Sequence, residues 1–453
     1  MATGFSETSE RRDAVQRGAG LAVAVLMIVY TLAFIDRQLL NLMLDPIRHT
    51  LALSDTEISV IQGIAFAAAY VVCGPIFGLL ADRVSRRLLL AMAAVVWSLA
   101  TLACGLATGF WALFLARAAV GAAEASVQPA AWSALADFYT RETLPRAMSI
   151  FLVAPYIGGG LALIFGGTLL ASSDAITTMV PRLAVFADWR IVFIIVGALG
   201  IVIAALMFLV REPQRRDLRG SDPESVGRPA GTPREVLGFL WHNRAFFGRF
   251  YGAMTCIVII LYAMPAWMPT LLLRVYSVPI ANLGIQYGAV MLVAGTVGVL
   301  FGPSLGRLLE RRGSRNGMLL VIVLALVGMV PASMAIPLLP NYVAALSVAG
   351  LFAFLYSVPQ AMAASMLQLT SPAHMRGLII SIYVMVINIA GLGLAPLLVA
   401  LLTDVVFGDP AMVGWSLGIV CTTAAVIGTW LALQARRYYD ELDPNSDRAP
   451  ATT

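Results

Sequence analysis

The sequence predicts an all-α polytopic membrane protein with twelve transmembrane helices in two pseudo-symmetric six-helix bundles. Of its 453 residues, 60% are hydrophobic and only 12% are charged, whereas soluble domains average about 25% charged residues. Apolar runs of about 20 residues, each long enough to cross about 30 Å of hydrocarbon, recur along the whole chain. An internal repeat of about 230 residues divides these runs into two halves.

The apolar runs define the expected spans and the polar segments that separate them. The spans are expected at 18–41, 57–80, 88–108, 110–136, 146–171, 190–210, 245–273, 281–305, 317–337, 342–369, 377–403 and 412–434. The chain then divides into an N-terminal tail (1–17), a first bundle (18–210), a linker (211–243), a second bundle (244–436) and a C-terminal tail (437–453). The first run is too long for a signal peptide, so no cleaved leader is expected.

Two of the polar segments have a predicted conformation. The linker is rich in proline, glycine and charge, and its end, PREVLGFLWHNRAFF, is expected to form an amphipathic helix at the membrane surface. The connection at 172–189 is expected to be the longest loop on the outer side.

Arginine placement predicts the orientation. The chain contains no lysine, and 24 arginines fall in the tails and even-numbered loops against four in the opposite loops. This bias predicts that both termini lie in the cytoplasm of a bacterial-type inner membrane. The arginines are scattered over separate short loops, which argues against nucleic-acid binding.

The chain offers little for metal, redox or enzymatic chemistry. Its cysteines all fall within spans without CxxC spacing, and its three histidines form no cluster, so neither a metal site nor a cofactor is expected. No P-loop and no nucleophile–base pair at usable spacing is found, which argues against an enzyme and against an ATP-driven pump.

The repeat is carried by short motifs between spans. GLLADRVSRR at 78–87 returns in degraded form 228 residues later as GRLLERRG at 306–313, and Arg146 is matched 230 residues later by Arg376. Pro129 and Pro359 keep the same spacing. Two landmarks in the same order at one period indicate homologous halves, a design typical of transporters.

The repeated loops are expected to act as latches that form in one conformational state and break in another. A small residue permits close helix contact, and a carboxylate can cap a helix or pair with arginine. The alternative is a simple topology anchor. The expected gating residues are Gly78, Asp82, Arg83, Arg86, Arg87, Asp137, Glu310 and Arg311.

Charges inside the expected spans are the main functional candidates, because a charge at the bilayer centre costs at least about 2.5–3.5 kcal/mol. Arg117, Gly121, Glu124 and Gln128 form one stripe on the fourth span. Arg117 and Glu124 are two turns apart, about 10 Å of rise, so each needs a partner elsewhere. Asp36 is the expected partner of Arg117.

On the first span, Asp36 and Arg37 are consecutive and therefore point about 100° apart. Arg37 continues a stripe with Phe34, Gln38 and Asn41, while Asp36 is expected to face a neighbouring helix. These charges either form a structural ion-pair network or let Asp36 or Glu124 take up a proton as the cavity opens.

The two halves differ chemically. The 230-residue offset replaces Arg117 by Ser347 and Glu124 by Phe354, so charge coupling is expected in the first half, through Asp36 and Glu124. The expected solute-binding residues are Phe34, Arg37, Arg117, Gln128, Tyr262, Tyr356, Gln360, Tyr383 and Asn388.

At these residues the chain resembles the major facilitator superfamily. GLLADRVSRR is similar to the family's loop signature G-x-x-x-D-R-x-x-R-R, and the resemblance covers residues 15–437. It implies two six-helix bundles around a central cavity that is lined by helices 1, 4, 7 and 10 and worked by rocker-switch alternating access.

Segments 34–47, 53–75 and 117–139 resemble the spinster (sphingolipid-transporter-like) group. That group has an Asp-Arg pair in helix 1 and R-x-x-x-G-x-x-E in helix 4, which Asp36, Arg37, Arg117 and Glu124 match; its usual glycine before the glutamate is Ala123 here. Animal members are similar to lipid exporters, so the resemblance implies a lipid-like substrate.

The sequence therefore favours a secondary active transporter that moves an amphipathic or lipid-like organic anion by proton-coupled alternating access and works as a monomer. The alternatives are an organic-anion:proton symporter for carboxylates and a proton-driven multidrug exporter. A receptor or scaffold that senses a ligand without moving it is disfavoured, because a sensor needs only one conformational gate and two gate loops are present.

Overall fold

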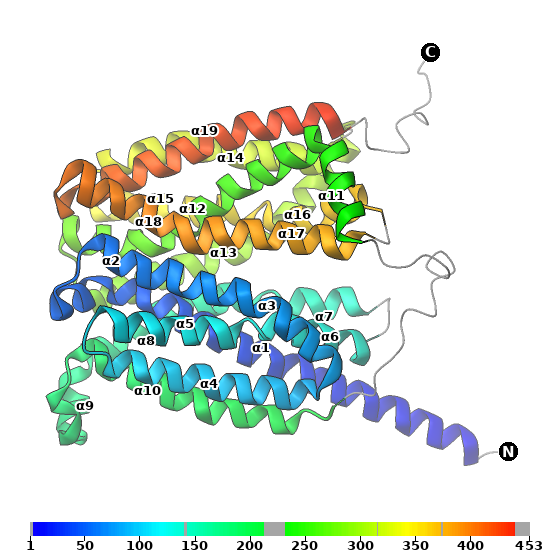
Figure 1. The fold of residues 1–453 in the computed structure, drawn as a ribbon, viewed down its shortest axis with the longest axis horizontal. Coiled ribbons are helices and arrows are strands. Elements are labelled where there is room, and N and C mark those ends of the chain that lie inside the picture. The colour runs from blue at the N-terminus through cyan, green and yellow to red at the C-terminus, as the bar shows by residue number, and fades with distance from the viewer. Residues whose placement is uncertain (1–2, 140–142, 213–231, 315, 373–374, 440–453) are drawn as a thin grey trace. The chain divides into compact units, whose positions relative to one another are not determined.

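The computed structural model describes residues 3–139, 143–212, 232–314, 316–372 and 375–439 (Figure 1). Within these ranges the chain is built from helices, and no strand occurs. Eleven helical stretches are long and apolar enough to cross a membrane, and the shorter apolar helix Tyr342–Ser357 covers the start of the remaining expected span. The all-α, twelve-span prediction is confirmed.

The helices follow the order of the expected spans. Those of the first half are α1 (Thr3–Leu51), α2 (Asp55–Ser59), α3 (Phe66–Arg83), α4 (Arg86–Leu106), α5 (Phe110–Glu124), α6 (Val127–Phe138), α7 (Leu144–Phe151), α8 (Ala154–Ala171), α9 (Ser173–Met179) and α10 (Asp188–Ala204). Those of the second half are α11 (Pro233–His242), α12 (Arg244–Tyr276), α13 (Ile280–Arg311), α14 (Gly317–Ala335), α15 (Tyr342–Ser357), α16 (Gln360–Thr370), α17 (Arg376–Asn388), α18 (Ala395–Leu401) and α19 (Val413–Tyr439).

Shorter π-helical and 3₁₀ turns complete the described secondary structure. The π-helical turns are Val60–Ala65, Ile389–Leu394 and Leu402–Phe407, and the 3₁₀ turns are Pro181–Val185, Ala205–Leu209, Ile336–Leu338 and Pro410–Met412.

Three expected spans are broken into two helices each. The breaks separate α5 from α6, α7 from α8 and α15 from α16. A proline follows or forms each break: Pro129 in the first turn of α6, Pro155 in the first turn of α8, and Pro359 as the N-cap of α16. Proline lacks the amide hydrogen that would continue the preceding helix, so it is tolerated at a helix start.

The connections also differ from a simple loop. Segment 172–189, expected as a loop, contains helix α9 and a 3₁₀ turn. The predicted helix at the end of the linker is present as α11, which begins at a capping box between Thr232 and Glu235. Its position at a membrane surface remains a prediction.

Contacts group the chain into two compact units, Met1–Arg216 with Pro279–Leu292, and Asp217–Val278 with Val293–Thr453. In the first unit α10 packs on α4, α1 packs on α8, and α5 packs on α3 and α4 (Figure 1). In the second unit α12 and α14 both pack on α19, and α15 packs on α12 and α14.

The start of α13 groups with the first unit through glycine contacts with α8. A Cβ added to Gly167 would lie 3.0 Å from the Cα of Gly284, and one added to Gly288 would lie 2.7 Å from the carbonyl oxygen of Gly160. Such spacing lets two helix backbones touch. The expected bundle limits, 18–210 and 244–436, remain a prediction, and most of the expected linker and C-terminal tail (213–231 and 440–453) lies outside the described residues.

Candidate functional site

A buried ion pair joins α1 to α5 in the first unit. Arg37 Nη2 lies 2.7 Å from Glu124 Oε2, and the side chains are 10% and 0% exposed. Arg37 Nε donates a second hydrogen bond to the same oxygen at 3.3 Å. Arg117 lies two turns from Glu124 on the same polar stripe, so Glu124 is expected to find its partner on another helix. That partner is Arg37, on the first helix.

Three aromatic rings surround the Arg37 guanidinium. Its central carbon lies 4.6 Å from the ring centroid of Phe34, 4.6 Å from that of Phe66 and 5.4 Å from that of Tyr70. The faces of such rings attract a cation, by up to about 2 kcal/mol where water is excluded. Glu124 and the rings together hold this cation in an apolar surrounding.

Asp36, which precedes Arg37 on α1, is 1% exposed. Its polar neighbours are Thr101 on α4 and the charged groups Arg117 and Glu124 on α5. The expected direct ion pair with Arg117 is not formed: among the described residues, Arg37–Glu124 is the ion pair within 4.0 Å that involves these four charges. The expectation that Asp36 directly pairs with Arg117 is wrong for this structure.

Asp36, Arg37, Arg117 and Glu124 form the charged cluster of the first unit. Three of these four side chains have a polar atom without a hydrogen bond among the described residues. Asp36 Oδ1, Glu124 Oε1 and Arg117 Nε are buried without a hydrogen-bond partner among the described residues. A buried group without a partner costs about 1–3 kcal/mol, and more when it is charged. Two carboxylates and two guanidiniums give the cluster a formal charge of zero when all are ionised, yet its hydrogen bonding is incomplete.

Gln128, on α6, joins the cluster through hydrogen bonds. Its Nε2 donates to the Tyr30 hydroxyl at 2.9 Å, and the Tyr70 hydroxyl donates to its Oε1 at 3.3 Å. The predicted stripe thus continues across the break between α5 and α6. Since Tyr70 also faces Arg37, Gln128 is linked to the ion pair through one aromatic side chain.

The polar stripe on α1 extends to the π-helical turn Val60–Ala65. Asn41 Nδ2 donates to Gln38 Oε1, and Gln62 Nε2, within that turn, donates to Asn41 Oδ1. Such turns are rare and often occur at functional sites.

Of the five solute-binding candidates of the second unit, two are buried and three are half-buried. Tyr356 and Tyr383 are 3% and 6% exposed, and the Tyr383 ring packs against that of Tyr251 at 5.4 Å. A Cβ on Gly391 would lie 2.6 Å from the Tyr262 ring. Gln360 Nε2 donates to the Tyr356 carbonyl at 3.2 Å. Asn388, half-buried, ends α17.

In the first gate loop, Arg86 is 3% exposed and forms an ion pair with Asp137. Its Nη1 also donates to the Ser133 carbonyl at 3.2 Å. These contacts join α4 to α6. Arg83 is exposed, and the side chain of Asp82 lies outside the described residues.

Gly78 does not provide the expected close helix contact. A Cβ added at this position would meet nothing within 4 Å, because the surface around it is open. The proposed gating role of Gly78 therefore has no packing contact in this structure to support it.

Glu212, which was not among the sequence candidates, caps α4. Its carboxylate accepts from the Ser85 hydroxyl at 2.7 Å and from the amides of Arg86 and Arg87 at 3.0 and 2.9 Å. Burial alone raises the pKa of Glu212, but the hydrogen bonds from Arg87, Ser85 and Arg86 outweigh burial, so the pKa is lowered. An anion at a helix N-terminus is stabilised by the helix dipole.

In the second copy of the loop, Glu310 and Arg311 are both exposed. The closest packing there involves Gly317, where a Cβ would lie 2.6 Å from the Gly306 carbonyl oxygen. The second loop therefore has a close helix crossing at Gly317, unlike the first loop at Gly78, and buries no charge at the two predicted positions.

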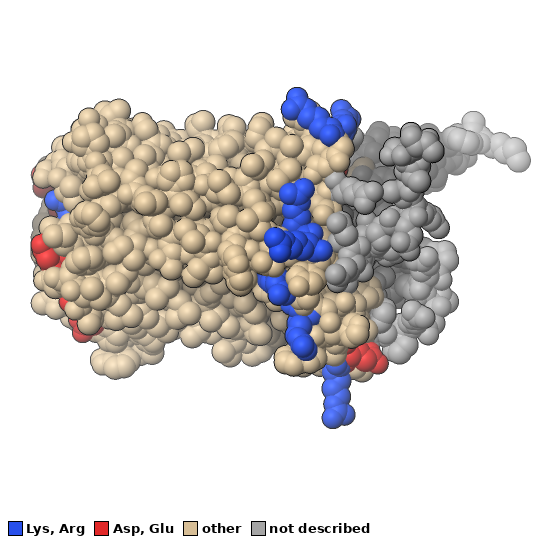
Figure 2. All heavy atoms as spheres, turned by 90° about the horizontal axis from the view of Figure 1, so that it is seen from above, with Lys and Arg blue, Asp and Glu red and all other residues tan. Residues whose placement is uncertain are grey.

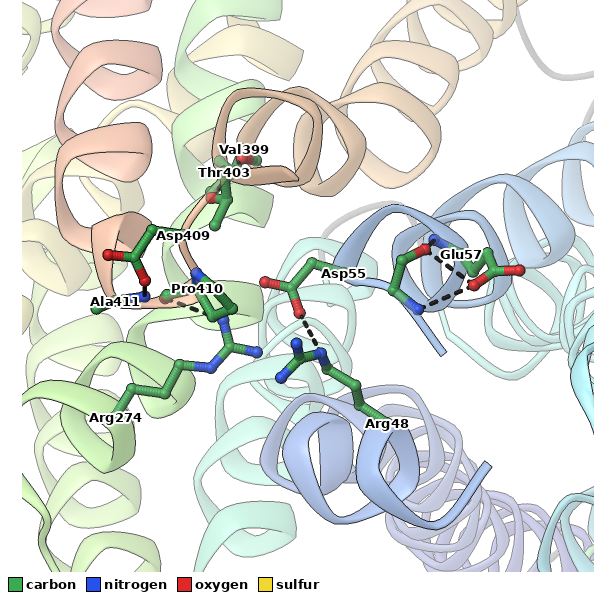
Figure 3. Close-up of polar contacts among 10 residues, drawn as sticks. Arg48, Asp55, Glu57, Arg274, Val399, Thr403, Asp409, Pro410 and Ala411 are labelled. Carbon is green, nitrogen blue, oxygen red and sulfur yellow. Dashed lines mark hydrogen bonds and ion pairs between the residues drawn. The ribbon is translucent and has the colours of Figure 1, made fainter. Parts of the chain in front are cut away.

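Loops at the other ends of the helices are tied separately in each unit (Figure 3). In the first unit Arg48 Nε lies 3.2 Å from Asp55 Oδ1, next to the capping box formed by Glu57. In the second unit Arg274 donates to the Pro410 carbonyl at 3.2 Å, and Asp409 accepts from the Ala411 amide at 2.8 Å.

Comparison with known proteins places these features in a family. The model of the Major Facilitator Superfamily matches residues 26–394. An "MFS-type efflux pump" of Mycolicibacterium smegmatis is 30% identical over 319 residues, which are 70% of this chain and 69% of that protein. "Protein spinster" of Drosophila melanogaster is 27% identical over 309 residues, 67% of this chain and 48% of that protein. "Protein spinster homolog 1" of Homo sapiens is 30% identical over 262 residues, 56% of this chain and 46% of that protein. The matches thus span about half the length of these two spinster relatives.

Solved structures agree on the fold. A bacterial homolog of the human lysosomal transporter spinster, in an inward-facing and unoccupied conformation, superposes with a TM-score of 0.77 at 23% identity, covering 96% of this chain and 99% of that one. A D-xylose-proton symporter gives a TM-score of 0.66 at 14% identity, covering 95% and 99%. The chain therefore belongs to the major facilitator superfamily and is a spinster-like membrane transporter, not an enzyme.

Proposed function

We propose that this transporter moves an amphipathic or lipid-like organic anion across the membrane together with protons. The observation that carries the proposal is the surrounding of Arg37: a guanidinium that is 10% exposed, paired with Glu124 and faced by three aromatic rings. A cation framed by apolar rings fits a solute with an anionic group attached to a hydrophobic body.

Proton coupling would run through Asp36 and Glu124. Both carboxylates are about 1% exposed, and each keeps an oxygen without a hydrogen-bond partner among the described residues. An anionic solute at Arg37 would compete with Glu124 for the guanidinium, and a carboxylate that loses its counter-charge in an apolar site favours its protonated form. Solute binding and proton uptake would then occur together, with Arg117 as the second cation of the cluster.

The same proposal places both termini in the cytoplasm of an inner membrane and treats the monomer as the functional unit. Figure 2 supports this placement of the termini. On the face that it shows, the arginine side chains gather in a band, and the broad surface beside the band carries no charge. Arginine accumulates on the cytoplasmic side of membrane proteins.

Two other substrates would use the same site. The efflux pump of M. smegmatis is a relative of comparable length, which favours a drug exporter as the second candidate. A small carboxylate carried with a proton is the third, since it would also bind Arg37. A hydrophobic cation would gain nothing from the guanidinium.

The test is transport by purified protein in liposomes that contain a pH-sensitive dye. Cholate, lysophosphatidylglycerol, succinate and ethidium serve as probes for the amphipathic anions, the carboxylates and the drugs. We expect cholate or lysophosphatidylglycerol to move protons, and Asp36→Asn to abolish that movement while the protein folds and inserts as before. Proton movement with succinate or ethidium alone would replace the proposed substrate class, and normal coupling in Asp36→Asn would remove Asp36 from the mechanism.

A further inference from the structure

Phe66 lies between the two arginines of the charged cluster. Its ring centroid is 4.6 Å from the guanidinium carbon of Arg37 and 5.4 Å from that of Arg117. The side chain is 1% exposed, so neither contact is shared with bulk solvent. One neutral ring therefore contacts the cation of the Glu124 ion pair and also Arg117, a charged neighbour of Asp36.

The position of this ring is set from several helices. Phe66 is the first residue of α3 and directly follows the π-helical turn Val60–Ala65. A Cβ added to Gly121 on α5 would lie 3.0 Å from the Phe66 Cα, so the glycine lets α5 touch the backbone at this point. The ring also stacks on Tyr70, with centroids 5.7 Å apart and planes inclined by 19°.

We infer that Phe66 is a positioning residue, which holds Arg37 and Arg117 apart, so that Arg37 stays paired with Glu124 and Arg117 stays beyond ion-pair distance from Asp36. The ring attracts both guanidiniums but accepts no proton. Its attraction for the two cations therefore stays the same when a carboxylate gains or loses a proton. Without the ring, the guanidiniums can move closer to the carboxylates. A closer positive charge favours the ionised form of a carboxylate. This inference concerns how the charges of the proposed function are arranged and rests on that proposal.

The groups that face this arrangement come from three elements. They are Tyr30, Asp36 and Arg37 on α1, Cys104 on α4, and Arg117 and Glu124 on α5, with Tyr70 on α3 itself. The carboxyl groups among them are those of Asp36 and Glu124, and the pH profile is used to follow these two groups.

The experiment replaces Phe66 by phenylalanine with one, two or three ring fluorines, which weakens the attraction for cations at nearly constant shape. Purified full-length protein in detergent is unfolded by heat from pH 4 to pH 9. The unfolding temperature is plotted against pH, and the midpoint is the pH at which half of its pH-dependent change has occurred. This midpoint should move to lower pH in steps as fluorines are added, by about one pH unit with three. Phe66→Tyr keeps the ring face and should match the parent.

Phe193→Leu is the matched control, because Phe193 is fully buried in α10 and packs on Trp189 instead of an arginine. It should lower the unfolding temperature without moving the midpoint. A midpoint that stays unchanged across the fluorine series, or that moves to higher pH, would overturn the inference. The assay uses no solute, so a stepwise shift together with failure of cholate-driven proton movement would reject the proposed function and leave the positioning role standing.

Discussion

Removing either partner of the Arg37–Glu124 pair should destabilise the protein unequally. Arg37→Gln leaves the Glu124 carboxylate, which is 0% exposed, without its cation, a change that costs about 3–5 kcal/mol in buried pairs. Glu124→Gln leaves Arg37 among three aromatic rings, which supply up to about 2 kcal/mol of attraction, so its cost should be smaller. The double variant should cost less than the sum by about 0.5–3 kcal/mol.

The assay is thermal unfolding of purified protein in detergent at pH 7, followed by size-exclusion chromatography of the remaining folded fraction. For a unit of this size about 1 kcal/mol corresponds to roughly 2–4 °C, so Arg37→Gln should lower the midpoint by roughly 6–20 °C. Arg311→Gln, which removes an exposed arginine of α13, should change it little. Additive single effects, or equal costs for the two partners, would refute the assignment of this pair and of the rings around it.

Three further variants test other contacts. Glu212→Gln should lower the unfolding midpoint by roughly 2–8 °C at pH 7, since a partly exposed capping carboxylate contributes about 1–2 kcal/mol. Because the pKa of Glu212 is lowered in the folded protein, its stabilisation is present above the unfolded value of about 4.3 and is lost as pH falls through the folded value, so the parent and variant midpoints should converge in acid; a constant difference down to pH 3 would contradict this. Asp137→Asn leaves Arg86, 3% exposed, without its carboxylate and should cost about 3–5 kcal/mol, measured by the same unfolding assay; a change below about 1 kcal/mol would contradict the burial of this pair. Gly121→Ala would push a methyl group against the Phe66 backbone and should cost about 1–3 kcal/mol, whereas Gly78→Ala should be tolerated; equal effects at the two glycines would show that the helix contact at Gly121 is absent.

The fold could be predicted from the sequence because its strongest constraint is simple. Runs of apolar residues long enough for the bilayer specify where helices cross, and a 230-residue repeat specifies two related halves. The breaks between α5 and α6 and between α15 and α16 were not predicted, although Pro129 and Pro359 lie beside them. Hydropathy does not change at a break, so only the prolines could have indicated it.

The charged residues of the site could be predicted, but their pairing could not. Rarity within apolar spans was enough to select Asp36, Arg37, Arg117 and Glu124. Which acid meets which base depends on how α1 and α5 rotate against each other, and helical periodicity within a single helix does not contain that information. Asp36 therefore looked like the partner of Arg117, while the structure pairs Arg37 with Glu124.

The residues that the sequence did not reveal are those without unusual chemistry. Phe66 is one aromatic residue among many in apolar spans, and only its distances to two guanidiniums distinguish it. Glu212 lies at the start of a charged linker, where a carboxylate is ordinary, yet it caps a helix more than 120 residues earlier in the chain. Contacts between segments distant in sequence require the fold itself.

The central claim is that protons move with the solute through the carboxylates of the first unit. The most direct measurement is proton uptake into liposomes on addition of cholate, recorded for the parent, Asp36→Asn and Glu124→Gln alongside cholate uptake itself. We predict that liposomes with the parent protein take up protons together with cholate and that those with Asp36→Asn take up no protons. Cholate uptake by Glu124→Gln should no longer depend on pH. Cholate uptake by the parent at the same rate with and without a pH gradient, and with no proton movement, would contradict the claim.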